Sequence, residues 1–113
     1  MSKSVEDQLS ELASRVGALG VTVSGVKYHQ SMFGCWELRA EKGGEKMELF
    51  WDAKDHLLEV RRPVGGDGPG LEWKLDCIHP LLDKTREQVF SFVFDFITTR
   101  LAAAQSVYEK TGN

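Results

Sequence analysis

Two runs of alternating apolar and polar residues meet at Gly43-Gly44, and they give the strongest structural signal in the chain. A Gly-Gly pair between alternating runs is typical of a two-residue hairpin turn, because glycine adopts positive φ without strain. With both glycines in the turn, Lys42 pairs with Glu45, and a shift by one residue would mix apolar and charged faces. One face of the predicted hairpin then carries the apolar pairs Ala40/Met47, Leu38/Leu49 and Trp36/Trp51.

Further strands are predicted on both sides of this hairpin. Val21–His29 alternates in two halves, and a bulge at Gly25 would bring the valines and Tyr28 of both halves onto one face. Residues 71–75 alternate Leu, Trp and Leu with charged residues, which predicts a last strand with its apolar side inward. Residues 63–70 hold four glycines and two prolines and are expected to form an irregular connection.

The strand after the hairpin is expected to begin at His56, because residues 52–55 suit a tight turn. Pairing Trp51 with His56 keeps the inner face apolar and places Phe50 beside Leu57 on the opposite, charged face. This apolar pair and its charged neighbours form the candidate partner-binding surface, which consists of Phe50, Leu57, Arg39 and Glu59.

Two amphipathic helices complete the pattern. Residues 4–19 place apolar residues on one stripe, with Ser4 as the N-cap. The second helix is expected from Arg86 to about Lys110, because Thr85 and Gln88 fit a capping box. Its apolar residues run from Val89 to Tyr108 and cover roughly 200° of the helix, wider than the stripe that a surface helix needs. Either the first helix or a second copy of the chain must cover the excess, so a homodimer through this helix is expected.

The order helix, five-stranded antiparallel meander and long helix predicts a two-layer α+β fold in a single domain spanning residues 1–113. The net charge of −3 is mildly acidic, and Lys and Arg are scattered among acids, so the sequence favours neither membrane nor nucleic acid as partner. The two cysteines do not form a disulfide framework, and we expect free thiols in a cytoplasmic protein.

Candidate chemistry is sparse. Cys77 and His79 would share a face of a strand, as a nucleophilic pair requires, but Pro80 favours a turn there and a buried structural cysteine. The histidines and cysteines lack the short paired spacings of a zinc site. We therefore expect no catalytic residues, no metal and no cofactor.

A row of Trp36, Trp51 and His56 on the inner face is the remaining candidate site. These rings would either belong to the core or wall a small-ligand pocket between sheet and helix. The leading functional hypothesis is a non-catalytic protein-interaction module, such as a small acidic adaptor, inhibitor or chaperone-like protein. The alternative is a ligand-binding protein or enzyme that uses this pocket. A single-stranded nucleic-acid binder comes third, because the rings lack a basic groove beside them.

Overall fold

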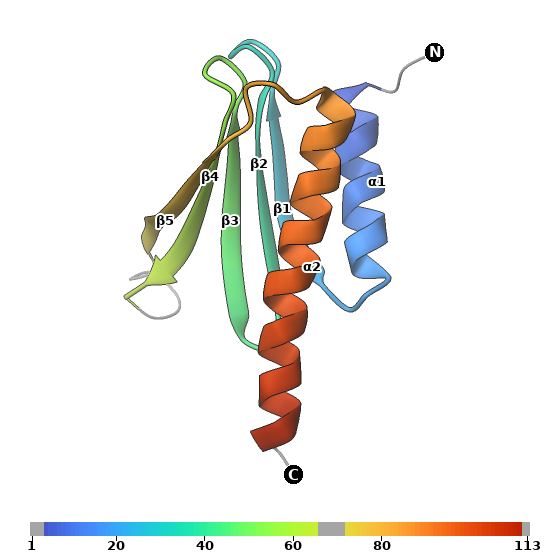
Figure 1. Cartoon of the computed structure of the whole chain (residues 1–113), viewed down its shortest axis with the longest axis vertical. Coiled ribbons are helices and arrows are strands. Elements are labelled where there is room, and N and C mark those ends of the chain that lie inside the picture. Colours follow the sequence, from blue (N-terminus) through green and yellow to red (C-terminus); the bar gives the residue numbers. More distant parts are fainter. Residues whose placement is uncertain (1–3, 66–71, 112–113) are drawn as a thin grey trace.

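A computed structural model describes residues 4–65 and 72–111 of the chain, and it has a two-layer α+β fold. One antiparallel five-stranded sheet has the order β1-β2-β3-β4-β5, and both helices lie on the same face of it (Figure 1). We call the face toward the helices the inner face and the opposite face the outer face. The elements are α1 (Val5–Gly17), β1 (Thr22–His29), β2 (Cys35–Lys42), β3 (Glu45–Asp52), β4 (Leu57–Val64), β5 (Glu72–Pro80) and α2 (Arg86–Thr111).

Both helices begin with the predicted caps. The Ser4 side chain accepts a hydrogen bond from the backbone N–H of Asp7, which satisfies one free donor of the first turn of α1. At the start of α2, Thr85 and Gln88 exchange side-chain-to-backbone hydrogen bonds of 2.9 and 3.2 Å, so the capping box is confirmed. The two helices begin at the same end of the molecule, and the last turns of α2 extend beyond the sheet (Figure 1).

The central hairpin has the predicted register throughout, from Lys42↔Glu45 to Trp36↔Trp51. Gly43 and Gly44 have φ values of 60° and 86°, which is the conformation that the turn requires. The register between β1 and β2 shifts between Val23 and Gly25, so the predicted irregularity near Gly25 is confirmed.

The predicted pairing of β3 with β4 is wrong by two residues. Trp51 lies opposite Leu58, and Phe50 lies opposite Glu59, where Leu57 was expected. The Asp52 side chain accepts two backbone N–H groups of the turn, and His56 adopts a φ of 56°, so the turn absorbs His56 and β4 begins later. A shift by two leaves each side chain on its predicted face but changes its neighbours.

The predicted orientation of β5 is wrong as well. The register between β4 and β5 shifts after Val60, so that Cys77 pairs with Val60 but Leu75 pairs with Arg61. Trp73 and Leu75 therefore lie on the outer face, and Cys77 and His79 lie on the inner face. The strand also runs through Pro80, where a turn was expected, and β4 includes Pro63 and Val64. Leu71 and residues 66–70 of the predicted connection lie outside the described residues.

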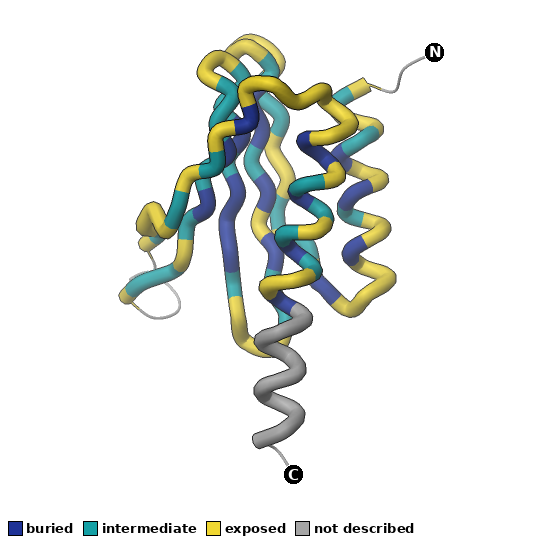
Figure 2. Tube along the Cα trace, viewed as in Figure 1, coloured by how far each residue is buried: buried dark blue, intermediate teal, exposed yellow. Residues whose placement is uncertain are grey.

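The core fills the space between the inner face and the helices (Figure 2). Trp36 stacks on Phe90 of α2, with ring centroids 5.4 Å apart. The first helix covers one flank of the apolar arc of α2, where the Arg15 guanidinium lies 4.0 Å from the centre of the Phe94 ring. Arg100, which lies within that arc, forms an ion pair of 2.8 Å with Asp76. The predicted arc residues beyond Leu101 lie outside the described side chains. Neither helix of the described chain is long and apolar enough to cross a membrane.

Candidate functional site

The outer face of the sheet carries apolar side chains that neither α1 nor α2 covers. They come from three neighbouring strands, and two of them, Leu75 and Ile78, are 52% and 44% exposed. An antiparallel sheet with one free face normally presents polar residues there, so several large apolar side chains on that face need an explanation. We call this group the outer strip and define it as Phe50, Leu57, Trp73, Leu75 and Ile78.

The sequence located only part of the outer strip. Phe50 and Leu57 share the outer face as predicted, but the register places them opposite Glu59 and Asp52 and not opposite each other. The first helix, which was one candidate to cover them, lies on the other face (Figure 1). The sequence did not predict Trp73, Leu75 and Ile78 as part of this surface. The alternation in β5 shows that Trp73 and Leu75 share a face, but it does not show that the β4–β5 irregularity turns this face outward.

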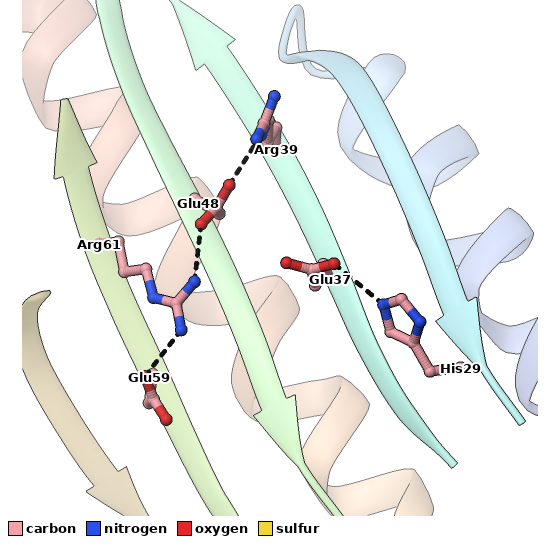
Figure 3. A network of polar contacts seen from close by, with 6 residues as sticks. All are labelled: His29, Glu37, Arg39, Glu48, Glu59 and Arg61. Atoms are coloured by element: carbon pink, nitrogen blue, oxygen red, sulfur yellow. Dashed lines mark hydrogen bonds and ion pairs between the residues drawn. The ribbon is translucent and has the colours of Figure 1, made fainter. Parts of the chain in front are cut away.

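A chain of charged groups crosses the sheet beside the outer strip (Figure 3). Glu48 is 3% exposed, and its carboxylate accepts hydrogen bonds from Arg39 Nε at 2.7 Å and from an Arg61 terminal nitrogen at 3.0 Å. Arg61 donates a further bond of 3.0 Å to Glu59. Burial lowers the pKa of Arg61, but its hydrogen bonds to Glu59 and Glu48 and their charges outweigh this and raise the pKa overall. Arg61 therefore stays charged throughout the neutral pH range.

The two arginines of this chain also contact the rings of the outer strip. Arg61 lies 5.3 Å from the centre of the Phe50 ring, and Arg39 lies 5.3 Å from the centre of the Trp73 ring. The predicted partner-binding residues Phe50, Arg39 and Glu59 are thus parts of one connected surface. The buried Glu48 is the group at its centre that holds both arginines in place.

Trp36, Trp51 and His56 line one cavity, which we call the end cavity. It has a volume of about 270 Å³ and lies where the β1–β2 and β3–β4 loops meet the start of α2. Trp36 and Trp51 are only 2% and 9% exposed, so they form part of both the core and the cavity wall. The His56 ring meets Trp51 edge-on, with centroids 5.8 Å apart, and it comes from the turn and not from the strand as predicted.

Cys77 and His79 lie side by side, with the sulfur 3.4 Å from Nε2. Burial raises the pKa of the Cys77 thiol, and the charge of Asp76 raises it further, which is opposite to the shift that a nucleophilic cysteine needs. The His79 ring packs against both Phe92 and Phe96, with ring centroids 5.2 and 5.3 Å away. Among the described residues, no group of three or more His, Cys, Asp and Glu side chains could hold a metal ion.

A second apolar hollow lies along α2, on the flank that α1 leaves open. Phe92, Asp95, Phe96, Thr99 and Arg100 line an open volume of about 580 Å³. The apolar arc of α2 thus faces the sheet at its centre, α1 on one flank and this hollow on the other. No protein-family model matches the chain, and neither a curated protein nor a solved structure is detectably similar to it.

Proposed function

We propose that this protein is a non-catalytic protein-interaction module that binds its partner with the outer strip. The observation that carries the proposal is the exposure of Leu75 and Ile78 on the sheet face opposite α1 and α2. Exposed apolar groups of this kind, bordered by charged residues, are typical of protein-binding surfaces. Burial raises the pKa of the Cys77 thiol, and this supports a role other than nucleophilic catalysis.

The charged border indicates what the partner presents. The Arg39 side chain is 49% exposed and uses its Nε–H on Glu48, which leaves its terminal N–H groups to face solvent beside the Trp73 ring. A carboxylate is the group that a guanidinium binds best. The proposed partner is therefore a protein segment with apolar side chains for the outer strip and an acidic side chain for Arg39.

Site-specific photo-crosslinking in the native cell tests this surface. A photoreactive amino acid at Ile78 should cross-link to one defined protein, whereas the same group at Leu19 should not, because Leu19 is equally apolar and 51% exposed but follows α1, away from the strip. The captured protein, once purified, should bind the Leu75→Ser and Arg39→Gln variants more weakly than the parent. Identical cross-links from both positions, or unchanged binding by both variants, would refute the proposed surface.

We also propose that the protein forms a homodimer through α2. The support is the open hollow beside Phe92 and Phe96. In a two-fold dimer the same face of α2 in a second copy would pack against it. Light scattering behind a sizing column should give twice the chain mass of 12.7 kDa at low micromolar concentration. Thr99→Arg, which fills the hollow, should yield monomer, whereas Ser14→Arg on the exposed side of α1 should not. A parent protein that elutes as a clean monomer would rule out this dimer.

The proposal places the protein in the cytoplasm. Its support is chemical, because both Cys35 and Cys77 are free thiols, as expected, and such thiols persist in a reducing compartment.

A further inference from the structure

The end cavity has features that neither core packing nor the outer strip explains. Its floor is formed by large rings, with Trp36 stacked on Phe90 and Trp51 beside them. Its lining includes Val5 and Arg86, the first residues of α1 and α2, and both helices begin at the same end of the molecule (Figure 1). At about 270 Å³ it is slightly smaller than the pockets of about 300–1,000 Å³ that hold drug-sized ligands. A compact ligand with one planar apolar group therefore fits its size.

The two Lys and Arg residues that line the end cavity lie at one place in the chain. Lys84 and Arg86 line it from the segment that leads into α2, and no Asp or Glu is among its described lining residues. Both cations are exposed, and neither has an ion-pair partner in the described part of the chain. In a protein with net charge −3, an acid-free cavity with two unpaired cations selects for an anion.

Two further observations indicate that the wall of the cavity is built for more than packing. His56 Nδ1 is buried and has no hydrogen-bond partner among the protein groups, although buried ring nitrogens normally have one. Phe33 and His56 are the two non-glycine residues with positive φ in the described chain, and both line this cavity. Unfavourable backbone conformations of this kind concentrate at binding sites, where the surrounding structure holds them.

We propose that the end cavity binds a small aromatic carboxylate, with its ring against Trp36, Trp51 and Phe90 and its carboxylate at the mouth beside Lys84 and Arg86. The apolar floor supplies most of the contact area, and the two cations set the orientation and the preference for a negative charge. His56 supplies a polar atom at the wall. This inference is independent of the proposed protein-binding function, because the end cavity and the outer strip lie on opposite faces of the sheet.

The position of the three tryptophans gives the experiment its internal control. Trp36 and Trp51 line the end cavity, whereas Trp73 lies on the outer face. Phenylacetate, titrated into ¹⁵N-labelled protein, should shift the indole N–H resonances of Trp36 and Trp51 and leave that of Trp73 in place. Phenylacetamide, which has the ring without the charge, and acetate, which has the charge without the ring, should each bind more weakly than phenylacetate.

Removing the cations tests the charge preference separately from folding. The double variant Lys84→Gln/Arg86→Gln should bind phenylacetate about tenfold more weakly, which is the effect of losing two exposed ion pairs. The matched control Arg62→Gln/Lys74→Gln removes the same charge from two exposed residues that lie opposite each other in β4 and β5. This control should bind phenylacetate like the parent. The proposal is overturned if phenylacetate shifts neither cavity tryptophan, if it shifts all three tryptophans alike, if phenylacetamide binds equally well, or if the two double variants behave the same.

Discussion

Glu48→Gln is the substitution that most directly tests how the outer face is held together. The amide keeps the shape of the side chain but removes its charge and replaces one acceptor oxygen with a donor. In the folded protein Glu48 receives bonds of 2.7 Å from Arg39 and 3.0 Å from Arg61 while its side chain is only 4% exposed. The variant would keep one acceptor for one arginine and turn an N–H donor toward the other.

The magnitude follows from these two bonds and from the exposure of the arginines. Hydrogen bonds to charged groups contribute about 1.5–3 kcal/mol each, so losing one and weakening the other could cost up to about 5 kcal/mol. The Arg39 and Arg61 side chains are 49% and 29% exposed, so both can turn toward water, and Arg61 keeps its bond to Glu59. We therefore expect the free energy of unfolding to fall by about 2 kcal/mol, well below the upper bound for a fully buried pair.

Urea denaturation measures this loss as a shift of the midpoint at constant slope. Glu45→Gln is the control, since Glu45 belongs to the same strand but is exposed, and its substitution should cost less than about 0.5 kcal/mol. If the two variants unfold at the same urea concentration, the charged chain across the sheet contributes nothing to stability, and the account of the outer face given above is wrong.

Three further predictions concern other parts of the fold. Leu49 is 0% exposed, so Leu49→Asp buries an unpaired carboxylate and should abolish the cooperative melt in circular dichroism; a parent-like melt would mean that the inner face is misassigned. Because its pKa is raised, Cys77 should stay protonated at neutral pH and react with iodoacetamide more slowly in the folded protein than in urea, and Asp76→Asn should not slow it further. Gly44→Ala should cost about 1 kcal/mol because φ is 86°, whereas Gly17→Ala, with open space and no positive φ, should be neutral or stabilising in the same urea assay.

The strand register was predicted correctly where the turn residues permit few geometries, and incorrectly where they permit several. Gly43-Gly44 permits few hairpin geometries, and the register of β2 with β3 was predicted pair by pair. The next turn uses Asp52 and His56, and a histidine does not mark a position of positive φ as a glycine pair does, so the pairing was predicted two residues out of place. Because side chains repeat every two residues along a strand, the apolar pattern is equally satisfied by both registers and could not correct the error.

The candidate sites divide in the same way. The pairing of Trp36 with Trp51 follows from the alternation of the hairpin, which the sequence contained, whereas His56 joins them from the turn and not through the strand pairing that was predicted. The outer strip depends on the irregularity opposite Val60, which turns Trp73 and Leu75 outward. A register shift of one residue is decided by three-dimensional packing, in which Arg61 joins Glu48 and Asp76 joins Arg100, and these contacts are far apart in sequence.

The order of the strands also has a consequence for how the chain folds as it is synthesised. Each strand pairs with the strand that precedes it in sequence, so the sheet can grow one hairpin at a time as the chain emerges from the ribosome. The helix that covers the middle of the inner face is the last element to be made. Until α2 emerges, Leu38, Leu49 and Val60 form an open apolar surface, and α1 has no second helix to pack against. The nascent chain therefore passes through a stage in which α1 covers only one side of the inner face and the middle of that face is in water, and truncation before Arg86 should arrest it there.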